Sequence, residues 1–128
     1  MVKYKQLQVL IVDDCLAIAK KLYELISENK LVNVIGQAKS VKQSLDMVTD
    51  FNLDVVFLDI NLPDGSGMEV LLYLKKIKPK VKVVIFSNSV NDLYKRKFTE
   101  KGSDYVLDKS KDFTKVPDII SSIIENHE

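Results

Sequence analysis

Two hydrophobic patterns alternate along the chain, and each occurs five times. Short, nearly continuous apolar runs rich in Val and Ile cover residues 7–12, 31–35, 55–58, 81–86 and 105–107. Such runs are typical of parallel strands that are buried on both faces. The segments between and after the runs carry apolar residues at helical spacing. These stripes are Ile18, Leu22, Leu25 and Ile26; Val41, Leu45 and Val48; Leu71, Leu74 and Ile77; Val90, Leu93, Tyr94 and Phe98; and Val116, Ile119, Ile120, Ile123 and Ile124.

Strands that alternate with helices predict an α/β fold. Short connections between them imply right-handed crossovers and a doubly wound, five-stranded parallel sheet with helices on both faces. A chain of 128 residues has the size of one compact domain, so we expect a single domain over residues 1–128.

Composition narrows the function classes. The chain has 19 Lys and Arg against 18 Asp and Glu, so no net field attracts nucleic acid or an acidic membrane surface. No apolar stretch approaches the roughly 18 residues of a membrane span, and the first residues lead into a strand rather than a signal-peptide core. The single cysteine, Cys15, excludes an internal disulfide and agrees with a reducing compartment. We therefore expect a cytoplasmic protein that neither inserts into membranes nor binds nucleic acid.

Polar residues follow four of the five predicted strands. Asp13 and Asp14 come after the first, Asp59 after the third, Ser87 after the fourth and Lys109 shortly after the fifth. In doubly wound sheets the ligand site lies beyond the carboxyl ends of the strands. The sequence therefore gathers three acids, a hydroxyl and an amine at the edge where chemistry is expected.

Three neighbouring carboxylates require a cation. At about 5 Å, each pair repels by roughly 3 kcal/mol at an effective dielectric constant near 20. Oxygen ligands without His or Cys favour Mg²⁺, and Mn²⁺ is also chemically suitable. A carboxylate can attack phosphorus to give an acyl phosphate when positive groups offset the charge on the transferring oxygens. Here Mg²⁺ and Lys109 would supply that offset.

Each residue also has a purely structural interpretation. Asp14 could cap the following helix, and residues 62–67 could form a tight turn before a helix capped by Ser66. Ser87 could be a structural hydroxyl, Lys109 a solvated surface amine, and Cys15 a small packing residue. The placement of all five site residues at strand ends favours the functional interpretation.

The motifs resemble those of response-regulator receiver domains. The resemblance rests on Val-Asp-Asp at 12–14, Leu-Asp-Ile-Asn-Leu-Pro-Asp-Gly-Ser-Gly at 58–67, Ser87, and Gly-Ser-Asp-Tyr-Val-Leu-Asp-Lys at 102–109. It covers essentially the whole chain. It implies the flavodoxin-like (βα)5 fold with the strand order 2-1-3-4-5 and a function in two-component or phosphorelay signalling.

The resemblance also implies a role for each site residue. Asp59 would be the phosphoacceptor. Asp13, Asp14, Asp59 and the backbone carbonyl of Asn61 would hold Mg²⁺, with Asp13 acting partly through water. Ser87 and Lys109 would bind the new phosphoryl group, so Asp59 and Lys109 would carry the chemistry. Such a domain is not an enzyme in its own right, although it assists its own phosphorylation and slow dephosphorylation.

Partners follow from the same resemblance. The phosphoryl donor would be a histidine kinase or a histidine phosphotransfer protein. A downstream protein would bind the surface formed by the fourth helix, fifth strand and fifth helix. The domain would be a monomer or a phosphorylation-dependent dimer. The chain ends soon after the fifth predicted helix, so we expect a stand-alone receiver, and a fragment of a longer regulator is the alternative.

Two positions depart from the family pattern. Val106 stands where the family usually has Phe or Tyr, and the adjacent Tyr105 should face the opposite side of the sheet. Ser110 stands where many members have a proline after a cis peptide bond. A non-proline cis bond costs about 3 kcal/mol, so the sequence leaves the isomer of the 109–110 bond open.

Three alternatives compete with this assignment. A haloacid-dehalogenase-like phosphatase also uses a nucleophilic Asp but needs a second Asp two residues later, where this chain has Asn61. A flavodoxin-like FMN domain would need a phosphate-binding loop in place of Asp13 and Asp14. A receiver-fold scaffold that is not regulated by phosphorylation is the third, and Val106 is its main support.

Overall fold

The structure, a computed structural model, describes residues 6–88 and 90–127. Its main sheet has five parallel strands in the order β2-β1-β3-β6-β7. The predicted order 2-1-3-4-5 is confirmed, since β6 and β7 are the fourth and fifth strands of this sheet. The strands are β1 (Leu7–Val12), β2 (Val32–Ala38), β3 (Val55–Leu58), β6 (Lys82–Ser87) and β7 (Tyr105–Asp108). The helices are α1 (Leu16–Ser27), α2 (Val41–Asp50), α3 (Gly67–Ile77), α4 (Asp92–Glu100) and α5 (Val116–Glu125), which follows a short 3₁₀ turn η1 (Phe113–Lys115).

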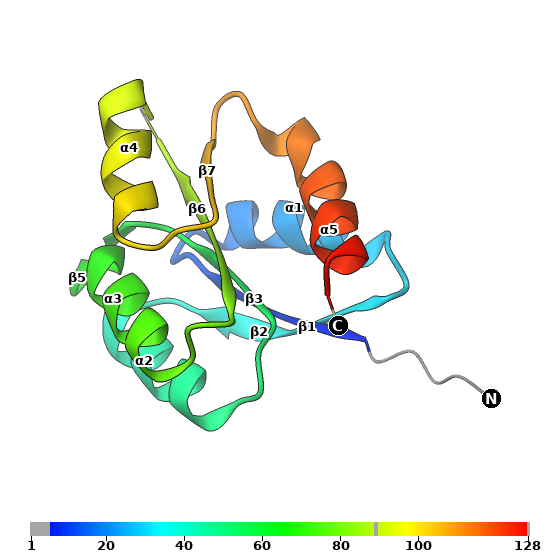
Figure 1. Cartoon of the computed structure of the whole chain (residues 1–128), viewed down its shortest axis with the longest axis horizontal. Coiled ribbons are helices and arrows are strands. Elements are labelled where there is room, and N and C mark those ends of the chain that lie inside the picture. Colours follow the sequence, from blue (N-terminus) through cyan, green and yellow to red (C-terminus); the bar gives the residue numbers. More distant parts are fainter. Residues whose placement is uncertain (1–5, 89, 128) are drawn as a thin grey trace.

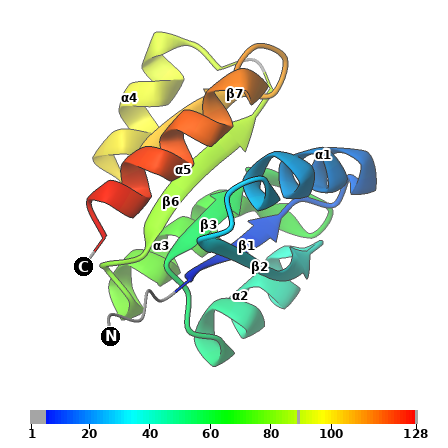
Figure 2. The ribbon, with the colours of Figure 1, turned by 90° about the vertical axis from the view of Figure 1, so that its right-hand side faces the viewer.

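Helices cover both faces of the sheet. Helices α1 and α5 lie on one face, and α2, α3 and α4 on the other (Figures 1 and 2). Strand β3 shows why its sequence is apolar throughout: Val56 and Leu58 face α2 and α3, whereas Val55 and Phe57 face α1 and α5. No helix in the described ranges is both long enough and apolar enough to cross a membrane.

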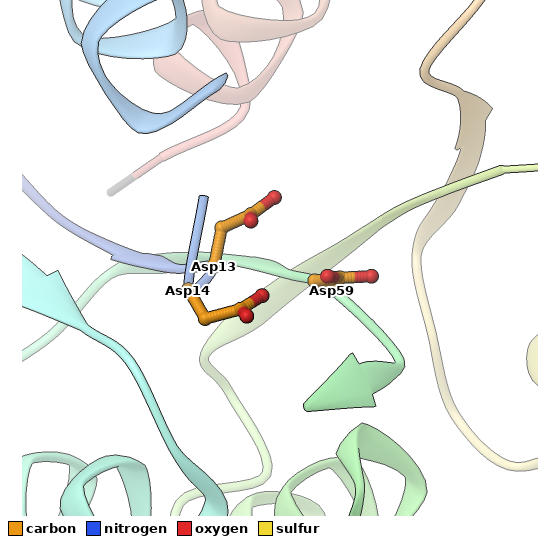
Figure 3. A group of neighbouring side chains, drawn as sticks. All are labelled: Asp13, Asp14 and Asp59. Atoms are coloured by element: carbon orange, nitrogen blue, oxygen red, sulfur yellow. The ribbon is translucent and has the colours of Figure 1, made fainter. Parts of the chain in front are cut away.

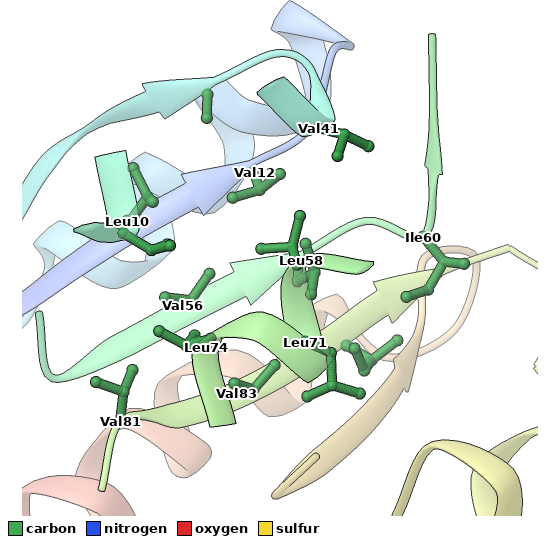
Figure 4. Packing of buried hydrophobic residues seen from close by; sticks show 14 of the residues in the cluster. Leu10, Val12, Val41, Val56, Leu58, Ile60, Leu71, Leu74, Val81 and Val83 are labelled. Atoms are coloured by element: carbon green, nitrogen blue, oxygen red, sulfur yellow. The ribbon is translucent and has the colours of Figure 1, made fainter. Parts of the chain in front are cut away.

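The core beneath α2 and α3 is formed by interlocking aliphatic side chains (Figure 4). Val12 and Leu58 extend from neighbouring strands toward Leu71 and Leu74 of α3, and all four are at most 1% exposed. Complete burial of such side chains stabilises a fold by about 1.5–3 kcal/mol each. The strand ends that carry the candidate site therefore rest on a closely packed base.

Two of the predicted helical stripes need correction. Leu93 is 73% exposed and Ile77 is 38% exposed, so neither is a core residue. Helix α4 begins only at Asp92, because the side chain of Asn91 accepts a hydrogen bond from the Tyr94 N–H and caps the helix. Val90 therefore lies in the loop before α4.

A small hairpin follows β3 where the sequence predicted only a turn. Strands β4 (Asn61–Leu62) and β5 (Gly65–Ser66) pair in antiparallel fashion, with Gly65 at a positive φ of 154°. Ser66 then caps α3, because its hydroxyl accepts a hydrogen bond from the Met68 N–H at 3.1 Å. The expected helix cap is confirmed.

Candidate functional site

Two buried aspartates mark the carboxyl ends of the central strands. The Asp13 N–H donates to the Ala38 carbonyl at 3.0 Å, and the Asp59 N–H donates to the Val12 carbonyl at 2.8 Å. These bonds continue the pairing of β1 with β2 and β3 by one residue. The two aspartates are only 1% and 5% exposed. The sheet therefore fixes both backbones, and burial restricts both side chains.

Asp14 completes a group of three carboxylates. One oxygen from each of Asp13, Asp14 and Asp59 lies within 4.8 Å of the other two, and the side chains extend toward the same side of the sheet (Figure 3). Asp14 itself is exposed. It does not cap α1: the N-cap is Cys15, whose N–H donates to Asp13 Oδ1 at 2.9 Å. The structural interpretation of Asp14 as a helix cap is wrong.

Lys109 reaches this group from the loop after β7. Its Nζ lies 2.7 Å from Asp13 Oδ2 and 3.1 Å from Asp59 Oδ2, and its side chain is 9% exposed. Its backbone N–H donates to the Ser87 carbonyl at 2.9 Å, so the ends of β6 and β7 are joined at the site. Lys109 is therefore not a solvated surface amine.

The pKa shifts reflect competition between burial and charge. Burial raises the pKa of Asp59, although the charge and hydrogen bond of Lys109 oppose the increase. Burial alone would lower the pKa of Lys109, but hydrogen bonds and charges from Asp13 and Asp59 raise it overall. Lys109 is thus stabilised in its ammonium form. For Asp59, the charge and hydrogen bond of Lys109 only partly offset the effect of burial.

The charge and ligand types fit a hard divalent cation. Three carboxylates against one ammonium leave an excess of negative charge, and each carboxylate pair repels by about 3.5 kcal/mol at 4.8 Å and an effective dielectric constant near 20. The ligand atoms are carboxylate oxygens, which suit Mg²⁺. Asn61 follows in β4, and its N–H donates to Asp59 Oδ1 at 3.3 Å. This set of oxygen ligands therefore suits Mg²⁺.

Asp108 connects the two loops beside Ser87 and Lys109. Its Oδ1 accepts the Ser110 N–H at 2.8 Å, and its Oδ2 accepts the Val90 N–H at 3.4 Å. No peptide bond between described residues is cis, so the 109–110 bond is trans. The carboxylate of Asp108 thus ties the loop after β7 to the loop after β6. Sequence inspection missed this residue because its partner Val90 is 18 positions away.

The prediction that Val106 and Tyr105 face opposite sides of the sheet is confirmed. Val106 packs with the residues beneath α3 and α4, whereas Tyr105 packs on the opposite face with those beneath α5. Ser87 is 1% exposed, and its Oγ has no hydrogen-bond partner among the described residues. Sequence inspection placed Tyr94 only in a helical stripe, yet its hydroxyl is also buried and without a described partner.

Comparison with known proteins decides the family. The model of the response regulator receiver domain matches residues 9–121, which include every candidate site residue. The chain belongs to the response regulator receiver domain family. A receiver domain is the phosphorylation-responsive module of two-component signal transduction. This membership decides against the haloacid-dehalogenase-like and flavodoxin alternatives.

Relatives and solved structures support the assignment. The domain is 34% identical over 101 residues to the sensory transduction protein LytT of Bacillus cereus, covering 79% of this chain and 41% of LytT. It is 30% identical over 122 residues to an uncharacterized response regulatory protein of Vibrio cholerae, covering 94% of this chain and 50% of that protein. The receiver domain thus spans half or less of these relatives. The BeF3-activated DrrB receiver domain superimposes with a TM-score of 0.82 at 25% identity, covering 94% of this chain and 98% of that domain.

Proposed function

We propose that this receiver domain accepts a phosphoryl group on Asp59 in a reaction that depends on Mg²⁺. The contact of Asp59 with Lys109 inside a group of three carboxylates carries the proposal. Asp59 is the one member of that group that combines burial, a raised pKa and a direct ion pair with the ammonium. A carboxylate in such surroundings is typical of a functional site rather than of a solvated surface.

In the proposed reaction, an Asp59 carboxylate oxygen forms a bond to phosphorus while the bond from phosphorus to the donor's leaving group breaks. The donor is the phosphohistidine of a histidine kinase or a phosphotransfer protein, and its imidazole leaves with the bonding electrons and takes up a proton. Mg²⁺, when bound by Asp13, Asp14, Asp59 and the Asn61 carbonyl, would offset charge on the transferring oxygens. Lys109 pairs with one phosphoryl oxygen, and the Ser87 hydroxyl donates to another. Hydrolysis of the acyl phosphate resets the domain.

The output of the domain is a change in partner binding. Ser87 ends β6 and Lys109 follows β7, so both lie beside the loops that lead to α4 and α5. A movement of these side chains toward the phosphoryl group shifts the population of the α4–β7–α5 surface between two states. A downstream protein binds that surface, and the domain works in the cytoplasm as a monomer or a phosphorylation-dependent dimer.

The test uses acetyl phosphate as donor, with Mg²⁺, and intact-mass measurement. Wild type should gain one phosphoryl mass, Asp59→Asn should gain none, and EDTA should abolish the gain. Asp54→Asn is a matched control, because Asp54 precedes β3 at the opposite end of the strand; it should behave as wild type. A wild type that gains no mass, with a cognate kinase as well, would refute the proposal and favour an unphosphorylated scaffold.

A further inference from the structure

Tyr94 occupies the side of the sheet from which the aromatic residue at position 106 is missing. Its ring packs against the same hydrophobic cluster as Val106 and stacks at a tilt on Phe98, with ring centroids 4.5 Å apart. Val106 has a short side chain, and α4 contributes the aromatic ring of Tyr94 to the same cluster. The hydroxyl of Tyr94 is buried and has no hydrogen-bond partner among residues 6–88 and 90–127.

A second hydroxyl without a described partner lies beside it. Ser87 Oγ is also buried and has no hydrogen-bond partner in the part of the chain that the structure describes. Burial raises the pKa of Tyr94, the neighbouring Ser87 hydroxyl lowers it, and the charge of Asp59 raises it. The phenolic oxygen is therefore close to Ser87 and senses Asp59, although the two hydroxyls do not form a hydrogen bond in this state. Two buried polar groups that are both unsatisfied in one place call for an explanation.

We propose that Tyr94 is the reporter of phosphorylation in this domain, through a hydrogen bond that its hydroxyl donates to Ser87 once Ser87 donates to a phosphoryl oxygen on Asp59. This inference rests on the proposed function of Asp59. It assigns to α4 a role that the family resemblance would place on β7. Tyr94 acts through Ser87 and is a positioning residue rather than a catalytic one.

The direction of the hydrogen bonds explains how Tyr94 responds to phosphorylation of Asp59. Without a phosphoryl group, neither hydroxyl has an anionic acceptor that fixes its proton. A phosphoryl oxygen orients the Ser87 proton toward itself and leaves the lone pairs of Ser87 Oγ as acceptors. Tyr94 can then complete a chain of two hydrogen bonds, in which each bond strengthens the other. Because Tyr94 belongs to α4, closing this chain draws α4 toward the end of β6.

The test follows tyrosine resonances in the full chain. The protein is labelled with 3-fluorotyrosine, and ¹⁹F spectra are recorded with Mg²⁺ before and after acetyl phosphate, with intact mass as a parallel readout. The Tyr94 resonance is assigned as the one lost in Tyr94→Phe, which keeps the packed ring. Tyr73 is the control, because its hydroxyl already pairs with Thr49 Oγ1 at 2.9 Å. We expect the Tyr94 resonance to shift on phosphorylation and the Tyr73 resonance to stay in place.

Two Ser87 variants separate coupling from general rearrangement. In phosphorylated Ser87→Ala the Tyr94 shift should be lost, and in Ser87→Thr it should return, because the hydroxyl is restored. A phosphorylated wild type whose Tyr94 resonance does not move would overturn the inference and leave the proposed function intact. An equal shift in Ser87→Ala would also overturn it. Absence of phosphoryl mass in wild type would instead overturn the proposed function, and the inference with it.

Discussion

Gly67→Ala should damage both folding and the proposed phosphorylation, because α3 begins against the backbone of Asp59. A Cβ added at Gly67 would lie 2.3 Å from the Asp59 carbonyl oxygen and 2.9 Å from the Ile60 Cα. Ordinary contacts begin near 3.4 Å, so the backbones have to separate by roughly 1 Å. The Gly67 N–H also donates to the Ile60 carbonyl at 2.7 Å, which opposes that separation.

The size of the effect follows from this geometry. Overpacking of a closely packed region costs about 1–3 kcal/mol, and we expect the upper end because the crowded atoms belong to the backbone. A domain with the usual ~5–15 kcal/mol of stability remains folded after such a loss. A displacement of about 1 Å at reacting groups lowers a rate by about 100-fold. Urea unfolding should measure the loss of stability. The rate of phosphoryl mass gain from acetyl phosphate should measure the loss of phosphorylation rate.

Gly36→Ala is the matched control. A Cβ at Gly36 would lie 3.3 Å from the terminal carbon of Met47, a flexible side chain that can move aside. We expect a stability change within about 0.5 kcal/mol, as for ordinary tolerated substitutions, and an unchanged rate of phosphorylation. If Gly67→Ala matches Gly36→Ala in both measurements, the close approach of α3 to Asp59 does not constrain the site.

Four further outcomes are expected. The raised pKa of Asp59 means that the folded state loses stability as pH rises from the ordinary aspartate range through that raised value. Metal-free Asp59→Asn should therefore be more stable than wild type at pH 7 in urea unfolding and should match it at low pH. Asp14 is exposed, so Asp14→Asn should have the same free energy of unfolding as wild type without metal. It should lose the stabilisation that Mg²⁺ gives wild type, about 2.7 kcal/mol at a Mg²⁺ concentration a hundredfold above Kd. An equal stabilisation of both proteins by Mg²⁺ would contradict the role of Asp14 as a ligand. Hydrogen bonds from Ser110 lower the pKa of Asp108, so the stabilisation by Asp108 is present above the ordinary aspartate pKa and disappears as pH falls through the lowered value. Asp108→Ala should therefore lower the free energy of unfolding at pH 7, and the loss should shrink as pH falls. Lys109→Met should bind Mg²⁺ more tightly by calorimetry, because a competing cation is removed, and weaker binding would show that Lys109 supports the metal site.

The sequence predicted those features that depend on period and order along the chain. Continuous apolar runs identified β1 and β3 with their observed bounds, and the parallel topology then placed Asp13 and Asp59 at one edge. It could not predict features that depend on which side chains meet across the fold. The carboxylate of Asp64 accepts the N–H of Val41, the first residue of α2, at 2.7 Å across 23 positions, where the sequence predicted only a turn. A local pattern carries no information about such a partner.

The same limit applies to the exposed face of α4. Leu93 has the helical spacing of the stripe, yet it is exposed, whereas Phe98 is buried and Tyr94 packs against the core. Packing on the sheet therefore turns Tyr94 inward, toward Ser87. The sequence shows that position 106 lacks an aromatic residue. It does not show that Tyr94 packs on the same cluster, because this depends on the rotation of α4 about its axis, which tertiary packing determines.

Lys109 has two roles that compete with each other. At 2.7 Å and 3.1 Å, its attractions to Asp13 and Asp59 are about 6 and 5 kcal/mol at an effective dielectric constant near 20, comparable with the combined repulsion among three carboxylates. The ammonium of Lys109 therefore offsets much of the repulsion among the carboxylates in the metal-free domain. A divalent cation held by Asp13 and Asp59 would take over that task and free Lys109 from the carboxylates. Under the proposed function, Lys109 would then pair with the phosphoryl group only when the metal is already bound, so one side chain would link metal binding to phosphoryl recognition.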